Sequence, residues 1–262
     1  MPEGDTVWLA ARRMHQALAG SELTRAELRV PQLAAVDLVG RTVSEVLSRG
    51  KHMLFRFTDG HTLRSHLRMD GTWQISPRGR PWRGGPAHAI RAVLSNAKWD
   101  CVGYRLYDLA YVPTSEERSL VGHLGPDLLG PDWDADEALR RLRAHDEAEI
   151  GVALLDQRNL AGIGTLYRTE GLFLAGIRPQ RRVGDIAPDL LPGLVDRIRR
   201  MMLHNRERPQ QSTTGSLRRG ETSWVFERDR LPCQRCGTCI ERGEQGPAPH
   251  QRVSYWCPTC QR

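Results

Sequence analysis

A chain of 262 residues is long enough to bury a sizeable core, so disorder along its whole length is excluded. No stretch approaches the roughly 18 apolar residues of a membrane span, and the chain start lacks a signal-peptide pattern, so we expect a soluble, cytoplasmic protein with no membrane partner. The net charge of +7 and the pI near 9.4 favour a polyanionic partner, although solubility alone can also produce such a charge.

The first half of the chain predicts one helix followed by strands. Apolar residues recur at helical spacing from residue 5 to about residue 18, with Asp5 as the expected N-cap. Short runs with strand character follow, punctuated by Gly and Pro, and they predict a β-sandwich that reaches to about residue 125. These runs are 22–30, 42–47, 53–58, 62–67, 72–75, 90–94 and 101–109. Residues 76–87, rich in Gly and Pro, predict a mobile loop.

The second half of the chain predicts helices. After Gly125-Pro126-Asp127 the pattern changes, and helices are expected over residues 136–144, 148–155, 164–174 and 190–205. The stretch 210–220 is rich in Ser, Thr, Gly and Arg and predicts a flexible loop.

Two CxxC pairs near the C-terminus predict a structural metal site. Twenty residues separate the pairs, and in a reducing compartment such spacing indicates metal ligation rather than disulfides. Thiolates favour zinc, and four protein ligands leave no open position, so one structural Zn²⁺ ion would hold a hairpin too small to fold alone. The expected ligands are Cys233, Cys236, Cys257 and Cys260. We interpret Cys239 as a spare and Cys101 as a core residue; coincidental burial of the paired cysteines is the alternative.

The first residues offer a nucleophile. Pro2 is a small residue that ordinarily permits removal of Met1, which must be absent if the secondary amine of proline is to react. An α-amino group titrates at about pH 8, so modest desolvation leaves a neutral fraction at physiological pH. Attack on a sugar C1′ would give an iminium that promotes strand cleavage by elimination, and Glu3 could donate a proton if burial raises its pKa. Pro and Glu are, however, also ordinary residues of a first helical turn.

Several motifs together resemble the formamidopyrimidine-DNA glycosylase and endonuclease VIII family along essentially the entire chain. They are Met-Pro-Glu-Gly at 1–4, Ser-Arg-Gly-Lys-His at 48–52, Ser-His-Leu-Arg-Met-Asp-Gly at 65–71, Leu-Asp-Gln at 155–157 leading to Ala-Gly-Ile-Gly at 161–164, and Tyr-Trp-Cys-Pro-Thr-Cys-Gln at 255–261. The resemblance implies a bifunctional DNA glycosylase and AP lyase of base excision repair. The opening Pro-Glu-Gly-Asp-Thr and the Tyr-Trp-Cys-Pro ending are more similar to the endonuclease VIII branch, which implies oxidised pyrimidines as substrates.

Two other functions stay open at this point. Oxidised purines such as formamidopyrimidines or 8-oxoguanine could be the preferred substrates of the same reaction. Alternatively, the chain could be a zinc DNA-binding protein that has kept the scaffold and lost the chemistry.

The resemblance also implies roles for individual residues. Pro2 would be the nucleophile that forms the Schiff base, and Glu3 the acid that protonates the deoxyribose as its ring opens. Lys51, one of only two lysines among 38 basic residues, would assist base departure and contact a phosphate beside the lesion. Arg252 would grip the lesion phosphate through its guanidinium fork. For Lys51 and Arg252 the alternative is a solvated surface residue.

Further DNA contacts are implied on two loops. Met69 would fill the gap left by the extruded base, helped by Arg68 and Asp70, whereas a core methionine on a strand is the competing interpretation. The second loop belongs to a motif that resembles the family's helix, two turns, helix element. There Gly162 and Gly164 would let backbone amides approach a phosphate at a helix N-terminus.

One residue of this motif departs from the family pattern. Thr165 stands where the family usually has Asn, and its hydroxyl has a shorter reach toward a phosphate. Glu170, further along the same helix, is expected to be structural.

These observations predict an α+β protein in four parts. A catalytic β-sandwich domain with an N-terminal helix spans residues 1–125, and a linker spans 126–135. A helical DNA-binding domain containing the two-turn motif covers 136–225, and a zinc-finger β-hairpin covers 226–262. The expected partner is damaged double-stranded DNA, with single-stranded or bubble DNA left open. The protein is expected to be a monomer associated with the nucleoid and to flip the damaged base out of the stack.

Overall fold

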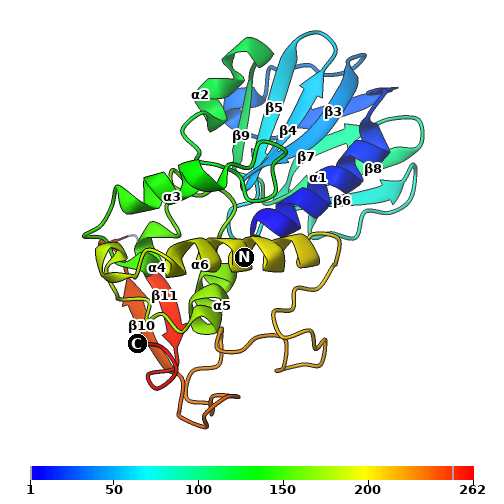
Figure 1. The fold of residues 1–262 in the computed structure, drawn as a ribbon. Helices are drawn as coiled ribbons and strands as arrows, with labels where there is room; N and C mark the ends of the chain where they lie inside the picture. Colours follow the sequence, from blue (N-terminus) through cyan, green and yellow to red (C-terminus); the bar gives the residue numbers. More distant parts are fainter. Residues whose placement is uncertain (1, 250) are drawn as a thin grey trace. The chain divides into compact units, whose positions relative to one another are not determined.

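The computed structural model describes residues 2–249 and 251–262, and the chain divides into two compact units, one ending at His123 and the other starting at Leu124 (Figure 1). In the part of the chain that the structure describes, none of the helices combines the length and hydropathy that a membrane crossing requires. The protein is α+β, with an N-terminal β-sandwich, a helical middle and a C-terminal hairpin, as the sequence predicts. The finer four-part division remains a prediction.

Unit 1 contains a long helix and two antiparallel sheets. Helix α1 (Gly4–Leu18) comes first, and the short helix α2 (Glu117–Val121), which the sequence pattern did not indicate, comes last. The five-stranded sheet has the order β1 (Ser21–Glu22), β3 (Thr42–Arg49), β4 (His52–Phe57), β5 (His61–His66), β9 (Asp108–Pro113). The four-stranded sheet has the order β2 (Arg25–Leu28), β7 (Ile90–Ser95), β8 (Trp99–Tyr104), β6 (Thr72–Pro77).

One apolar core joins α1 to the inner faces of both sheets. It includes Met14 from the helix, Phe55 from the five-stranded sheet, and Leu94 and Cys101 from the four-stranded sheet. Each of these side chains is almost fully buried, which confirms Cys101 as a core residue. Burial raises the pKa of the Cys101 thiol to about 12, so it stays protonated and inert.

Each of two predicted strands is divided in the structure into two shorter strands, one in each sheet. Residues 22–30 divide into β1 and β2, and residues 101–109 divide into β8 and β9. The predictions of single strands were wrong because both sheets face the same core, so apolar residues before and after the crossing are equally buried. At the second crossing Arg105 adopts a left-handed φ of 53° and turns the chain.

The start of α1 also differs from the prediction. Glu3, not Asp5, is the N-cap residue: its backbone is extended, and its carbonyl oxygen accepts a hydrogen bond from the Val7 amide at 3.0 Å. Asp5 lies within the first turn and is buried. The helix therefore begins earlier than the apolar periodicity indicated, because its first turn is already packed against the protein.

Unit 2 is a set of helices with a two-stranded hairpin. Its helices are α3 (Ala135–Arg143), α4 (Ile150–Ala153), α5 (Thr165–Ala175) and α6 (Leu190–Asn205), and its strands are β10 (Glu241–Gln245) and β11 (Arg252–Trp256). Three predicted helices are confirmed to within one residue. The helix predicted over residues 148–155 is shorter in the structure and consists of the single turn α4. Its start is later because Ala148 and Glu149 pair with Val183 and Arg182 instead of joining the helix.

Candidate functional site

The first turn of α1 lies at the same end of unit 1 as the turn between β3 and β4. The Val46 amide donates to Nδ1 of His15 at 3.1 Å, and the Gly20 amide donates to the Val43 carbonyl at 2.8 Å. The C-terminal part of α1 is thus fastened beside the first half of β3, on which the helix packs. The helix must then start near the other end of β3, where the chain turns through Gly50 and Lys51 into β4 (Figure 1).

This end of the unit brings together three of the predicted catalytic residues. Pro2 is half-buried and Glu3 is only 2% exposed, so the acid is held away from bulk water. Lys51 occupies the two-residue turn after Gly50, whose φ of 57° suits glycine. Lys98 lies at the opposite end, since its neighbour Asn96 donates to the carbonyl of Ala17 near the end of α1. Only one of the two lysines therefore reaches the Pro2 end.

The loop that follows β5 reaches the same end. His66, the last residue of β5, pairs with His52, the first residue of β4, so residues 67–71 leave the sheet beside the Lys51 turn. Met69 is 65% exposed, which rules out the competing interpretation of a core methionine on a strand. Arg68 has a φ of 54° and forms an ion pair with Asp108 at 2.7 Å.

Two histidines form a neutral layer behind the Lys51 turn. The ring centroids of His52 and His66 lie 4.6 Å apart. Burial lowers the pKa of His52 to about 3 and that of His66 to about 4, so neither ring carries a charge at physiological pH. Burial opposes ionisation of the adjacent Asp108, but the charges of Arg64 and Arg68 outweigh it and keep the pKa of this carboxyl below its usual range.

Sequence reasoning missed two residues at this end, the exposed Tyr107 and the half-buried Arg105. Tyr107 is 58% exposed, and Arg105 donates from Nε to the Asp70 carbonyl at 3.1 Å. Both were placed inside the single predicted strand 101–109. A signal was available: Cys101 faces the core, so an uninterrupted strand would also have pointed Arg105, four residues later, into the core.

In unit 2, a side chain organises the turn before α5. The Gln157 side-chain oxygen accepts from the Gly162 amide at 3.0 Å, and its nitrogen donates to the Ile163 carbonyl at 3.0 Å. Gly162 has a φ of 104°, which favours glycine. Gly164 is the N-cap residue of α5, and Thr165 is its first helical residue. This arrangement presents a helix N-terminus in the position that the sequence predicted for a phosphate contact.

The predicted phosphate arginine lies close to the same helix. Arg168, one turn after Thr165, is fully buried and donates to the Val253 carbonyl, which fastens the start of β11 to α5. Arg252 precedes Val253 and is exposed. Arg168, Arg252 and Asp156 line one cavity of about 230 Å³ within this unit. Unit 2 therefore brings Arg252 to the first turn of α5.

Glu170 is structural, as expected. Its carboxylate is fully buried and accepts from the Trp224 amide at 2.8 Å and from the Val225 and Phe226 amides at 2.9 Å. The Thr213 hydroxyl is a fourth donor to the same carboxylate. These bonds tie α5 to the residues that lead into the hairpin and to the 210–220 loop.

The four paired cysteines form a cluster that could bind a metal. Their sulfur atoms all lie within 4.8 Å of one another; Cys233 and Cys260 are 3.9 Å apart, and Cys236 and Cys257 are 3.5 Å apart. Four thiolates around a tetrahedral Zn²⁺ at about 2.3 Å would have sulfur atoms separated by about 3.8 Å, so the geometry fits this ion. Cys239 is exposed and lies outside the cluster, consistent with its interpretation as a spare.

Comparison with known proteins places the chain in a family. Residues 1–106 match the model of the formamidopyrimidine-DNA glycosylase N-terminal domain, and residues 124–216 match that of the formamidopyrimidine-DNA glycosylase H2TH domain. The chain is 52% identical over 261 residues to a protein of Streptomyces coelicolor named probable endonuclease 8 2, covering 100% of the chain and 94% of the relative. The chain belongs to the formamidopyrimidine-DNA glycosylase and endonuclease VIII family.

Other members of the family are similar over the full length. The DNA-(apurinic or apyrimidinic site) lyase Nei2 of Mycolicibacterium smegmatis is 42% identical over 261 residues, covering 100% of this chain and 99% of the relative. The structure of Lactococcus lactis Fpg in complex with DNA containing an abasic site has the same fold. Its TM-score is 0.81 at 23% identity, with 99% of each chain covered.

Within the family architecture, the predicted site residues fall in three segments. Pro2, Lys51 and Met69 lie in the part matched by the N-terminal domain model, and Thr165 lies in the part matched by the H2TH model. Arg252 and the four clustered cysteines lie beyond residue 216, outside both matches. The clustering of the four cysteines in the structure therefore supports the predicted hairpin independently of the two family models.

Proposed function

We propose that this family member is a bifunctional DNA glycosylase and AP lyase that removes oxidised pyrimidines in base excision repair. The observation that carries the proposal is the meeting of Pro2, the buried Glu3 and the Lys51 turn at one end of unit 1. Similarity to proteins named endonuclease 8 and DNA-(apurinic or apyrimidinic site) lyase supports the choice of reaction and branch. We assign the activity to the cytoplasm, on nucleoid DNA.

The reaction starts at the amine of Pro2 after Met1 has been removed. This amine attacks C1′ of the damaged nucleotide, and the bond from C1′ to the base breaks. Glu3 protonates the ring oxygen of the sugar as the ring opens, which leaves an iminium between Pro2 and the open sugar. The iminium withdraws electrons and acidifies the C2′ hydrogens. Loss of a C2′ proton expels the phosphate on the 3′ side, and loss of a C4′ proton then expels the phosphate on the 5′ side. These two steps are the β,δ-elimination that nicks the strand.

Four further positions are proposed to hold the DNA. Lys51 contacts a phosphate beside the lesion and assists base departure, and Arg252 grips the lesion phosphate with its guanidinium fork. The amide end of α5 at Gly164, with the Thr165 hydroxyl, contacts a further phosphate. Met69, an exposed apolar side chain on a loop, fills the gap left by the flipped base.

Arg68 and the cysteine cluster have supporting parts in this proposal. Arg68 sets the shape of the Met69 loop through its ion pair with Asp108. The four clustered cysteines hold one structural Zn²⁺, whose chemistry is to fix the hairpin that presents Arg252. Thr165 reaches less far than the Asn usual in the family, so we expect a weaker contact at that phosphate.

Covalent trapping tests the proposal. The enzyme, shown by intact mass to begin at proline, is incubated with an abasic-site duplex and sodium borohydride, and a stable adduct at Pro2 is expected. Glu3→Gln should still trap on this substrate, whose base is already absent, but should lose excision of thymine glycol and dihydrouracil. A variant with an uncleaved extension before Pro2 should not trap, and Lys98→Arg should trap normally.

Two outcomes would contradict the proposal. The absence of an adduct with protein that begins at proline would remove the catalytic function and favour the non-catalytic DNA-binding alternative. Faster excision of 8-oxoguanine than of dihydrouracil from matched duplexes would keep the chemistry and overturn the pyrimidine preference.

A further inference from the structure

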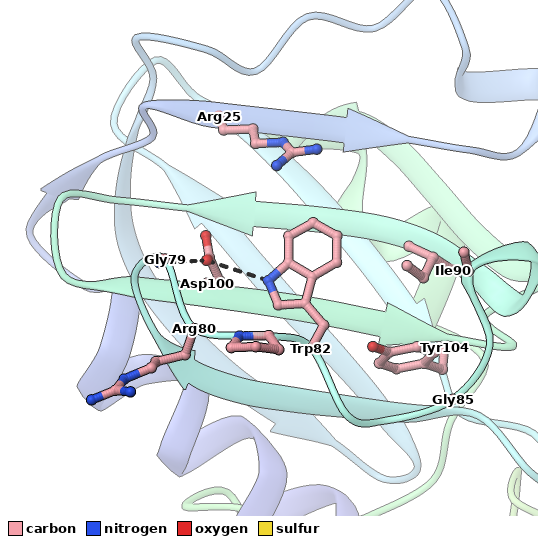
Figure 2. Close-up of a pocket in the computed structure, with 10 residues that line it drawn as sticks. Arg25, Gly79, Arg80, Trp82, Gly85, Ile90, Asp100 and Tyr104 are labelled. Carbon is pink, nitrogen blue, oxygen red and sulfur yellow. Dashed lines mark hydrogen bonds between the residues drawn. The ribbon is translucent and has the colours of Figure 1, made fainter.

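A strap of ten residues, 78–87, lies over the outer face of the four-stranded sheet (Figure 2). In β8, Cys101 faces the core, so Asp100, Val102 and Tyr104 face the other way. The strap and this outer face border an open pocket of about 580 Å³. None of these residues belongs to the site proposed around Pro2.

The strap is fastened to the sheet, although its sequence predicted a mobile loop. Asp100 is 4% exposed and accepts from the Arg78 guanidinium at 2.7 Å and from the Gly79 amide and the Trp82 indole at 3.3 Å each. At Gly84 a Cβ atom would come within 2.2 Å of the Tyr104 ring, so only glycine lets the strap backbone lie this close. The cavity therefore has fixed walls.

The charge around the cavity is strongly positive. Arg25 and Arg29 share Glu27, and Arg78 neutralises Asp100. Arg80 and Arg83 are exposed, and in the described part of the chain neither forms an ion pair. The five arginines of this face meet two carboxylates, which leaves a surplus of three positive charges. An anionic ligand would therefore be attracted to the strap.

The walls of the cavity are aromatic as well as basic. The guanidinium of Arg25 lies 5.0 Å from the centre of the Trp82 ring, and Tyr104, Ile90 and Pro81 add apolar surface. Figure 2 shows the Trp82 ring standing over the sheet between Arg25 and the strap backbone. A flat, apolar group fits beside such a ring, and the volume lies within the range of sites that hold molecules of nucleotide size.

We propose that the strap, with Arg25, is an accessory binding site for single-stranded nucleic acid. A base enters the cavity beside Trp82, and Arg80 and Arg83 contact the neighbouring phosphates. Arginines interleaved with an aromatic residue, next to a glycine-rich backbone, bind single strands with little sequence preference, because every base has a flat face. The site extends the proposed function by holding a strand that flanks the lesion, but it requires none of the chemistry at Pro2.

The test measures binding of a fluorescent 12-nucleotide oligothymidylate to the full-length protein by anisotropy, over a series of salt concentrations. To keep the strand out of the catalytic site, the measurement is repeated on enzyme trapped by borohydride on a short abasic duplex. The double variant Arg80→Ala/Arg83→Ala should lower the slope of log affinity against log salt by about 1.4, because each lost phosphate contact removes about 0.7. Arg13→Ala/Arg118→Ala, which removes two exposed charges elsewhere on unit 1, should leave the slope unchanged.

The aromatic contact is tested separately. Trp82→Ala should weaken binding of the oligothymidylate about tenfold, whereas Trp82→Phe keeps a flat ring and should lose much less. Because Trp82 also donates to Asp100, the melting temperature of each variant is compared with that of the wild type. The two strap arginines are exposed, so their double variant tests the site even where Trp82→Ala fails to fold.

Two results would overturn the inference. In the first, the strap and control double variants bind the oligothymidylate with equal affinity and equal salt slope. In the second, polyglutamate binds in a manner that depends on Arg80 and Arg83 while oligothymidylate does not, which would indicate an acidic protein partner. Borohydride trapping on a short abasic duplex should be normal in every strap variant. Failure of trapping in the wild type, with the strap effects intact, would remove only the proposed function.

Discussion

The sandwich and the C-terminal hairpin hold their functional residues by different physical means. In unit 1 a large apolar core, with 22 buried residues in the described part of the chain, supports the end where Pro2 and Lys51 lie. In the described part of the chain, the hairpin that carries Arg252 shares a cluster of 6 buried residues with Phe173 of α5, and two of the six, Cys233 and Cys257, belong to the proposed metal site. We therefore expect apolar burial to suffice for the site residues of the sandwich, and metal ligation to be needed for those of the hairpin.

Removal of the metal should produce the largest difference between the two regions. Zinc binding by such a cluster contributes on the order of 10 kcal/mol, more than the hairpin core can replace. Cys257→Ser, or a strong chelator, should therefore unfold residues 226–262 and leave the sandwich folded. Hydrogen exchange measured peptide by peptide would show fast exchange in the hairpin and unchanged protection in β4 and β5.

The matched control is Cys239→Ser, which removes an exposed thiol of the same hairpin outside the cluster. It should change neither zinc content nor exchange. A hairpin that stays protected after the metal has been removed would contradict the contrast between the two regions.

The carboxylate that joins α5 to the hairpin should have the next largest effect. Glu170→Gln keeps the shape of the side chain but loses the charge and one acceptor oxygen, so donors among the Trp224, Val225 and Phe226 amides are left unsatisfied. We expect a loss of about 2–3 kcal/mol in the free energy of unfolding of unit 2. Urea unfolding followed by tryptophan fluorescence measures it. An exposed acid of the same unit, Glu147→Gln, is the control.

The buried histidines predict a pH dependence confined to unit 1. His52 and His66 have folded pKa values of about 3 and about 4, whereas an unfolded histidine titrates near 6.5. The unfolded chain therefore binds more protons below pH 6.5. Stability is fully present above that pH and is lost as the pH falls toward 4. At pH 5 each histidine lowers the free energy of unfolding by about 2 kcal/mol.

Substitution separates this contribution from general acid effects. His52→Gln should reduce the loss of stability between pH 7.5 and pH 5, measured by urea unfolding, by about 2 kcal/mol. His88→Gln, at an exposed position, should leave the loss unchanged. If the wild type and His52→Gln lose the same free energy of unfolding between pH 7.5 and pH 5, the His52 ring does not cause the effect.

Arg252→Ala should have the smallest effect of the four, because it removes one exposed contact without disturbing the fold. It should weaken binding to duplexes of every lesion type and lower the slope of log affinity against log salt by about 0.9. The hairpin should keep its zinc and its exchange protection. An unchanged slope would mean that Arg252 does not touch a phosphate.

The sequence predicted those features that leave a local signature. The bounds of α6 match the 3.6-residue apolar period, and the CxxC spacing located the cysteine cluster. The motifs at Pro2, Lys51 and Met69 indicated the proposed catalytic end before any fold was known. Each of these depends on residues close together in the chain.

Features that depend on distant residues could not be predicted. The sheet crossing at Leu23–Thr24 has no turn signature, because its polar groups are satisfied by the Arg41 and Ser95 carbonyls far along the chain. The strap had the composition of a free loop, but the buried Asp100, far along the chain, fastens it. The cause is the same in both: hydrogen bonds over long sequence separations override local propensity.

Helix α5 has a consequence for how the enzyme responds to oxidative stress. This helix is about 16 Å long, and Arg168, Thr169 and Glu170 are buried in its middle. It can neither rotate nor slide without breaking the hydrogen bonds that Arg168 and Glu170 form with other segments. One end carries the Gly164 turn, and at the other end the Gly176 carbonyl accepts from the amide of Arg262, two residues after Cys260, at 3.0 Å. Oxidants that damage bases also attack thiolates. Oxidation of the clustered cysteines would then loosen the Gly164 turn at the far end of α5. Repair would weaken under the same oxidising conditions that create its substrates.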